Sequence, residues 1–123
     1  FDVRKPYFNL DANGRFDALG EVINRGIELS VSGPITRRFS VVAGSVLLWP
    51  RVTGTGVALG RVGNRPVGAI SRRIEINLDW RPPILEGLGV DMAISHRSPE
   101  TATVSARTAI PARTLVDLGA RYS

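Results

Sequence analysis

Hydrophobic and polar residues alternate with a period of two through the middle of the chain. In residues 70–81 the even positions carry Ile, Arg, Ile, Ile, Leu and Trp, and the odd positions carry Ser, Arg, Glu, Asn, Asp and Arg. Apart from Arg72, the two sets separate into an apolar and a polar side, as the faces of a β-strand do. A helix would scatter Ile74, Ile76 and Leu78 around its circumference. The pattern therefore predicts a strand over residues 70–81, long enough to match the roughly 9 to 11 tilted residues that cross a bilayer.

The same alternation recurs along the rest of the chain and predicts an all-β fold. One segment differs from the others, because apolar residues occupy both parities of residues 39–49. That segment fits either a half-exposed strand or a strand covered on both sides. The sequence therefore predicts an antiparallel up-and-down meander of about six strands, at residues 1–8, 20–33, 39–49, 70–81, 88–95 and 112–123.

The connections between these strands alternate in length. Long ones cover residues 9–19, 50–69 and 98–111, and short ones cover residues 33–38 and 82–87. Since successive connections of a meander lie at opposite ends, one end collects short turns and the other long loops, as in outer-membrane barrels. This sorting favours a segment of a transmembrane β-barrel, which in isolation would be an open, curled or self-associating sheet.

Aromatic residues agree with two interfacial girdles. Phe39, Trp80 and Tyr122 fall at the short-turn end, and Trp49 and Tyr7 fall at the long-loop end, as the two membrane interfaces of a barrel require. A small soluble β-barrel or sandwich that binds an apolar ligand remains the alternative. In that fold the same apolar residues would face inward.

Composition narrows the class further. The 123 residues correspond to about one domain, and no stretch approaches the 18 uninterrupted apolar residues of a transmembrane helix. The chain also begins without the pattern of a signal peptide. Its net charge of +5 comes from arginines spread along the sequence, which argues against nucleic-acid binding. With no cysteine there is neither a disulfide framework nor a thiolate metal site.

Two apparent catalytic signals lack their required context. The glycines of residues 54–60 faintly resemble a phosphate-binding loop, but Gly63 and Pro66 follow where a helix N-terminus would be needed. Ser95 and His96 are adjacent, yet no nucleophile elbow accompanies them. We therefore expect no catalytic site, no metal site and no cofactor.

Binding is the remaining chemistry. Arginines in the long connections could meet an anionic ferric chelate through bidentate guanidinium contacts, or equally the phosphates of surface lipopolysaccharide. These loop candidates are Arg51, Arg61, Arg65 and Arg107. Polar residues of the strands would line a wet lumen, where they solvate it, pair with one another or contact a plug. These lumen candidates are Arg73, Glu75, Asn77, Asp79, Asp91 and Arg97.

Several short segments are familiar in their order and spacing. They are FDVRKPY at residues 1–7, NRGIE at 24–28, GPIT at 33–36, RRIEINLDW at 72–80 and VDLGARY at 116–122. Together they resemble the barrel of TonB-dependent outer-membrane receptors, most closely the siderophore-receptor branch. The resemblance covers nearly the whole chain. It implies a barrel of about 22 strands with a plugged lumen, in the outer membrane of a Gram-negative cell. It also implies uptake of a ferric siderophore or a similar scarce ligand, with energy supplied by the TonB complex through the plug.

The sequence also departs from that family. It shows no plug domain, no short box that would contact TonB, and no closing segment that ends in an aromatic residue. We therefore interpret residues 1–123 as an internal barrel segment that contacts outer-membrane lipid. Its two sheet edges would need a partner, such as a second copy of the chain.

Overall fold

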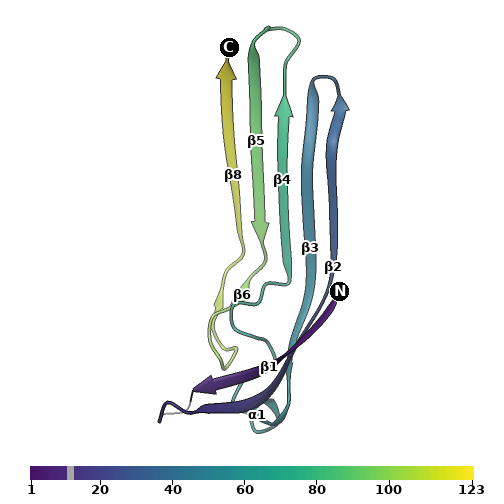
Figure 1. The fold of residues 1–123 in the computed structure, drawn as a ribbon. Coiled ribbons are helices and arrows are strands. Elements are labelled where there is room, and N and C mark those ends of the chain that lie inside the picture. Colours follow the sequence, from purple (N-terminus) through teal and green to yellow (C-terminus); the bar gives the residue numbers. More distant parts are fainter. Residues whose placement is uncertain (11–12) are drawn as a thin grey trace.

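The chain folds into one open, twisted sheet with a smaller two-stranded sheet beside it (Figure 1). The computed structural model describes residues 1–10 and 13–123; Asp11, part of the turn chemistry in the sequence, lies outside them. The large sheet has the order β1-β2-β3-β4-β5-β8, with every neighbouring pair antiparallel. The predicted all-β meander is therefore confirmed, and the sheet is not closed. The elements are β1 (Asp2–Leu10), β2 (Phe16–Thr36), β3 (Phe39–Thr53), α1 (Thr55–Ala58), β4 (Arg72–Trp80), β5 (Leu88–Arg97), β6 (Glu100–Thr101), β7 (Ala109–Ile110) and β8 (Arg113–Tyr122).

The strand on which the sequence prediction was centred is shorter than expected. β4 has 9 residues, whereas β2 has 21. At its start the ladder is interrupted, because the Ser98 hydroxyl oxygen accepts hydrogen bonds from the amides of Ser71 (2.9 Å) and Arg72 (3.1 Å). Ile70 makes only an isolated bridge, with Glu100. The amides of Ser71 and Arg72 thus bond to a side-chain oxygen, and β4 begins two residues later than predicted.

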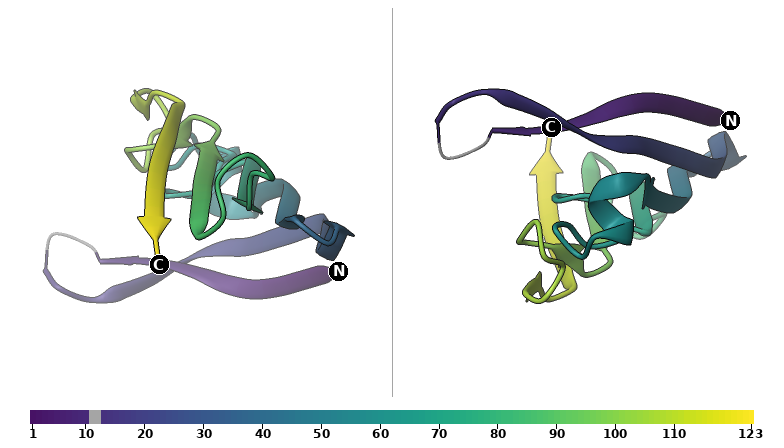
Figure 2. Two further views of the ribbon diagram at one scale, coloured as in Figure 1. Left: turned by 90° about the horizontal axis from the view of Figure 1, so that it is seen from above. Right: turned by 90° about the horizontal axis from the view of Figure 1, so that it is seen from below.

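The predicted loop over residues 9–19 is wrong. β1 continues through Leu10 and β2 begins at Phe16, so most of this stretch is a hairpin that projects to one side of the other strands (Figure 2). The rings of Phe8 and Phe16 meet edge to face across it, with centroids 6.4 Å apart. Such cross-strand aromatic pairs stabilise a hairpin. Gly14, with φ of 75°, supplies turn geometry near its tip.

The first short turn lies slightly later than predicted. Thr36 pairs with Phe39, so the turn is Arg37 and Arg38, and Pro34 lies inside β2 at a register shift. The amide of Arg38 donates to the Thr36 hydroxyl oxygen over 3.2 Å. Pro34 therefore marks a local irregularity in the ladder instead of the centre of the turn. The second short connection follows β4 at the same end of the sheet.

The predicted long connections fold against one another. Residues 50–69 hold the end of β3 and the single helical turn α1, and residues 98–111 hold β6 and β7. Gly63 donates its amide hydrogen to the Val104 carbonyl (2.8 Å), and Gly68 donates to that of Thr101 (2.8 Å). A buried apolar cluster ties them to the strands: Leu19, Val22, Val52 and Val62, with Tyr7, Val57 and Val104 packed around it. We call these seven residues the loop-end cluster.

Truncating the loop-end cluster should loosen the loops. Leu19 is 5% exposed, and Leu19→Ala should destabilise this end by about 2–4 kcal/mol through lost burial and a residual cavity. Hydrogen exchange should quicken at the amides of Val52 and Gly63, which bond to the segments at Asn64 and Val104. Leu59→Ala is the matched control, since Leu59 is 66% exposed and its truncation should change stability by less than about 0.5 kcal/mol. Equal exchange in the two variants would contradict the packing described.

The register gives the large sheet one apolar and one polar face. Residues opposite each other in the ladder share a face, and one row of such partners runs Val31, Ala43, Ile76, Ile94 and Val116 across five strands. The neighbouring row, on the other face, runs Ser32, Val42, Asn77, Ala93 and Asp117. The apolar face is uncovered, with Leu29 65% and Leu118 75% exposed. No helix within residues 1–10 and 13–123 is both long and apolar enough to span a bilayer.

Candidate functional site: the polar face and the long-loop end

The polar face carries all of the strand residues that the sequence singled out. Arg73, Glu75, Asn77 and Asp79 alternate along β4, and Asp91 and Arg97 lie on the same face of β5. The ladder sets like charges opposite each other, Asp79 with Asp91 and Arg73 with Arg97. Directly opposed like charges destabilise a sheet unless other groups neutralise them. The charged groups around these two pairs therefore determine which of the four side chains remain free to bind a ligand.

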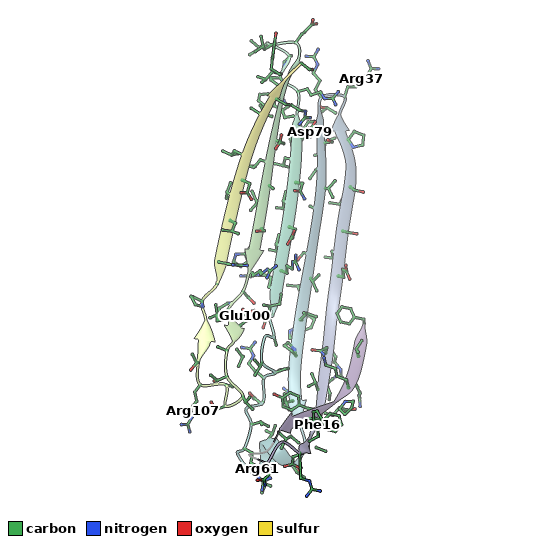
Figure 3. All side chains as sticks on the ribbon, turned by 60° about the vertical axis from the view of Figure 1, so that its left-hand side comes forward. Phe16, Arg37, Arg61, Asp79, Glu100 and Arg107 are labelled. Atoms are coloured by element: carbon green, nitrogen blue, oxygen red, sulfur yellow. The ribbon has the colours of Figure 1, made fainter. Side chains whose placement is uncertain are left out.

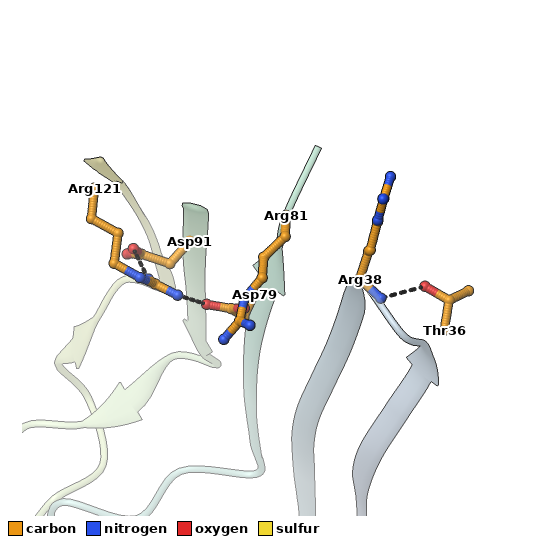
Figure 4. Close-up of polar contacts among 6 residues, drawn as sticks. All are labelled: Thr36, Arg38, Asp79, Arg81, Asp91 and Arg121. Carbon is orange, nitrogen blue, oxygen red and sulfur yellow. Dashed lines mark hydrogen bonds and ion pairs between the residues drawn. The ribbon is translucent and has the colours of Figure 1, made fainter. Parts of the chain in front are cut away.

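Arg121 neutralises the acidic pair (Figure 4). Its Nη1 donates to Asp91 Oδ1 over 3.2 Å, and its Nη2 donates to Asp79 Oδ2. Arg81 adds a longer ion pair to Asp79, with 3.8 Å between Nε and Oδ1. Arg121 thus connects β8 to β5 and β4 at the short-turn end. Sequence reasoning did not include it among the candidates, although it shares a parity with Asp117 on β8.

Two glycines make room for this bridge. Arg121 lies opposite Gly89 and Asp91 lies opposite Gly119. A Cβ added to Gly89 would lie 3.0 Å from Arg121 Nε, and one added to Gly119 would lie 2.9 Å from Asp91 Cγ. The two long polar side chains therefore lie over positions that carry no side chain. Gly89 and Gly119 thus leave space on the polar face for the side chains of Arg121 and Asp91.

Basic residues form a row at the other end of the polar face. Arg73, Arg97 and Arg113 are successive partners across β4, β5 and β8. Glu75 neutralises Arg73, with 2.6 Å between Nη2 and Oε1. The guanidinium groups of Arg97 and Arg113 make no hydrogen bond or ion pair within the described residues. Sequence reasoning missed Arg113, which its parity with Asp117 and Arg121 would have placed on this face.

The four loop arginines do not converge on one site. Figure 3 shows Arg61 and Arg107 well apart at the long-loop end. Arg61 Nη1 lies 3.4 Å from Asp17 Oδ2. Arg51 and Arg65, by contrast, line one hollow of about 790 Å³. They share it with Arg25 and Trp49, and Arg65 Nη2 donates to the Ser71 hydroxyl oxygen over 2.6 Å.

The aromatic residues follow the predicted girdles with one difference. Phe39 and Trp80 are direct partners on the apolar face at the short-turn end, and Tyr122 lies opposite Leu88 on the same face. Trp49 lies on that face at the other end, 57% exposed. Tyr7 packs instead against the loop-end cluster. The ladder places Tyr7 opposite Gly20, on the same face as Val22 and therefore on the other side of the sheet from Trp49.

The two apparent catalytic signals have structural explanations. Residues 55–58 form one helical turn where the sequence predicted none, and the buried Gly56 packs on Leu19, whose carbonyl oxygen would lie 2.9 Å from an added Cβ. The ladder places Ser95 opposite Glu75 and His96 opposite Ile74, so these adjacent side chains lie on opposite faces. His96 Nδ1 bonds instead to the Thr114 hydroxyl at 2.8 Å. Across the described residues, no three His, Asp or Glu side chains gather in a way that could hold a metal.

Comparison with known proteins finds siderophore receptors in both sequence and structure. The chain is 27% identical over 124 residues to the ferrichrome receptor FcuA of Yersinia enterocolitica, a match that covers 100% of this chain and 16% of that protein. It superposes on the crystal structure of BauA, the ferric preacinetobactin receptor of Acinetobacter baumannii, with a TM-score of 0.78 and 28% identity, over 98% of this chain and 19% of that one. No model of a known protein family matches the chain.

A second solved structure supports the fold alone. The siderophore receptor PiuA of Acinetobacter baumannii matches with a TM-score of 0.82 and 19% identity, over 98% of this chain and 18% of that one. These three proteins are named as receptors. The resemblance to TonB-dependent siderophore receptors that the sequence indicated is confirmed. The chain spans less than a fifth of the length of each of these three proteins.

Proposed function

We propose that this chain is a segment of the barrel of a TonB-dependent receptor, which takes up a ferric siderophore through the outer membrane of a Gram-negative cell. Residues 1–123 supply six of the barrel strands, and their open edges at β1 and β8 pair with further strands. In this assignment the apolar face contacts lipid and the polar face lines the lumen. The plug and its contact with TonB belong to parts of the receptor outside this segment.

The observation that carries the proposal is the apolar face that continues across five strands. Only a closed barrel or a helix can cross a bilayer, because every backbone polar group must be bonded. A barrel strand then alternates lipid-facing apolar with lumen-facing polar residues. The partners from Val31 through Ile76 to Val116 form an apolar row of this kind across five adjacent strands. Similarity over nearly the whole of this chain to part of a ferrichrome receptor and of a ferric preacinetobactin receptor supports the ligand class.

The soluble alternative is less well supported. A small barrel or sandwich would enclose its apolar residues, whereas the described sheet is open and its apolar face is uncovered. Val116, 57% exposed, and Leu118, 75% exposed, lie on that face beside the free edge of β8. An apolar surface that continues over several strands without a cover is typical of contact with lipid or another protein.

Two sets of cations are placed to meet an anionic ferric chelate. Arg97 and Arg113 lie on the lumen side near the loops, and neither guanidinium group is neutralised in the described chain. Arg107 is exposed on the long-loop end and is likewise unpaired there. Guanidinium groups bind carboxylates and related anions through two parallel hydrogen bonds. We assign these three residues, together with Arg61, to capture and passage of the ligand.

Uptake of radioactive iron tests this function. Cells that lack the receptor gene should fail to accumulate iron from one class of ferric siderophore, and the intact gene should restore accumulation. Restoration should vanish in cells without TonB. Arg97→Gln/Arg113→Gln should lower the affinity for the ferric siderophore about tenfold, since a charge-assisted hydrogen bond contributes about 1.5–3 kcal/mol.

A matched variant controls for the loss of charge. Arg37→Gln/Arg38→Gln removes the same charge at the opposite end of the sheet and should leave binding unchanged. Uptake that does not depend on TonB would overturn the assignment to this class of receptor. Equal affinity in the two variants would remove Arg97 and Arg113 from the site and leave the class intact.

A further inference from the structure

The hairpin of β1 and β2 carries an asparagine–glycine pair near its tip, where it projects to one side of the other strands (Figure 2). Asn13 and Gly14 are both exposed. Gly14 has φ of 75°, and a Cβ added to it would meet no described atom within 4 Å. Its amide makes no hydrogen bond within residues 1–10 and 13–123. In the described chain, the backbone nitrogen that follows the Asn13 carboxamide is therefore shielded by neither a side chain nor a hydrogen bond.

This nitrogen can attack the side-chain carbonyl carbon of Asn13. A bond forms between the Gly14 nitrogen and Asn13 Cγ, which closes a five-membered imide, and the carboxamide nitrogen leaves as ammonia with the proton that the Gly14 amide loses. Water then adds to one of the two imide carbonyls and breaks its bond to nitrogen. Opening at Cγ gives aspartate, and opening at the main-chain carbonyl gives isoaspartate. The net change is the uptake of one water molecule and the loss of one ammonia.

Three other asparagines lack this arrangement. Asn24 and Asn77 lie in β2 and β4, in ladders with a strand on each side. There the following amide can reach the carboxamide only after local opening of the sheet. Asn64 is exposed in a connection, but Arg65 follows it, and its carbonyl oxygen accepts a hydrogen bond from the Val52 amide (2.8 Å). A larger following residue and a fixed peptide group both hinder ring closure.

Isoaspartate at the tip would disturb the pairing of the hairpin. The main chain of isoaspartate passes through Cβ and Cγ and is longer by one atom. Loop length and turn geometry fix the register of hairpin strands. Phe8 and Phe16, with ring centroids 6.4 Å apart, lie on the two strands that this turn joins. Farther along β2, Leu19 is 5% exposed in the loop-end cluster. The disturbance should therefore reach the aromatic pair and stop at Leu19.

We propose that Asn13 is a site of spontaneous deamidation and isomerisation, and that its isoaspartate form loosens the outer part of the hairpin. The co-reactant is water, and the reacting groups are the Asn13 carboxamide and the Gly14 amide. The inference goes beyond the proposed function and depends neither on the ligand nor on which face of the sheet contacts lipid.

Peptide mass spectrometry of the intact, detergent-purified receptor during incubation in buffer tests the site. The carboxamide of Asn13 should be converted to a carboxylate more than about tenfold faster than that of Asn77, because reaction at Asn77 first requires opening of the ladder. Asn64 should also react more slowly than Asn13. An isoaspartate methyltransferase should label the peptide that contains residue 13. Asn13→Gln should abolish both signals, since its carboxamide would have to close a six-membered ring. Equal rates at Asn13, Asn64 and Asn77 would overturn the site.

Hydrogen exchange tests the consequence for the hairpin. Receptor enriched in isoaspartate by incubation should exchange the amides of Phe8 and Phe16 faster than the Asn13→Asp variant, which has the same new charge on a main chain of normal length. The amide of Val52, in the loop-end cluster, should exchange equally in both proteins. Equal exchange at Phe8 and Phe16 would contradict an effect of the longer main chain. Faster exchange at Val52 as well would contradict a disturbance confined to the outer hairpin.

Discussion

Ile76→Arg should destabilise the barrel by about 2–4 kcal/mol, which is the cost of a cationic side chain on the lipid face at the bilayer midplane. Ile76 lies halfway between Arg72 and Trp80, which bound the apolar face on β4, and it is flanked by Ala43 and Ile94. A guanidinium group there would lie between two apolar partners, four residues along β4 from each border of the apolar face. Urea unfolding of the intact receptor from phospholipid vesicles measures this effect.

Asn77→Arg is the matched control for this prediction. It introduces the same side chain one residue along the same strand, but on the polar face opposite Val42 and Ala93. Lumen positions tolerate charge, so this variant should lose less than about 1 kcal/mol. If instead Asn77→Arg were the more damaging of the two, the assignment of the faces would be reversed and the apolar residues would be internal.

Removing Arg121 should have the second large effect. Arg121→Gln leaves the carboxylates of Asp79 and Asp91 directly opposite each other. Of their cationic partners, only Arg81 remains, with its Nε 3.8 Å from Asp79 Oδ1. Opposed like charges destabilise a pair of strands. The urea midpoint of unfolding should fall, and the strands β4, β5 and β8 should exchange their amide hydrogens faster at the short-turn end.

A double variant isolates the electrostatic part of this effect. Adding Asp91→Asn to Arg121→Gln removes one of the two opposed charges and should recover most of the lost stability. Such a double-mutant cycle measures the coupling between residues in contact. Additive losses would show that Arg121 acts through packing over Gly89 instead of through the two carboxylates.

The alternation of apolar and polar residues predicted most of the strands, because a strand with two different faces has a pattern that can be recognised within a short segment. Residues 72–80 and 113–122 are strands as predicted, and the short turns lie where the glycine and proline signals placed them to within a few residues. The N-terminal hairpin was missed because its strands pair through contacts such as that of Phe8 with Phe16, which no local pattern encodes, although Gly14 marks the turn between them. The loop-end cluster was missed for a similar reason, since Val22, Val62 and Val104 meet only in space.

For candidate residues in strands, odd or even position in the sequence predicts the face on which the side chain lies. For candidate residues in loops it predicts nothing. Arg73, Asp79 and Asp91 share a face because their spacing along regular strands fixes it. Arg113 and Arg121 carry the same signal and could have been included. Arg65, in contrast, lies in an irregular segment, and its place beside Arg51 follows from hydrogen bonds of residues 64–71 to β3. No periodicity encodes that contact.

Depth-dependent fluorescence quenching tests the central assignment most directly. A fluorophore attached at Leu118 or at Asp117, neighbours on opposite faces of β8, is compared in receptor reconstituted into vesicles whose acyl chains carry a quencher. The assignment predicts strong quenching at Leu118 and weak quenching at Asp117, which would face a water-filled or plugged lumen. Equal quenching at the two positions, or stronger quenching at Asp117, would contradict a membrane-spanning segment with its apolar face toward lipid.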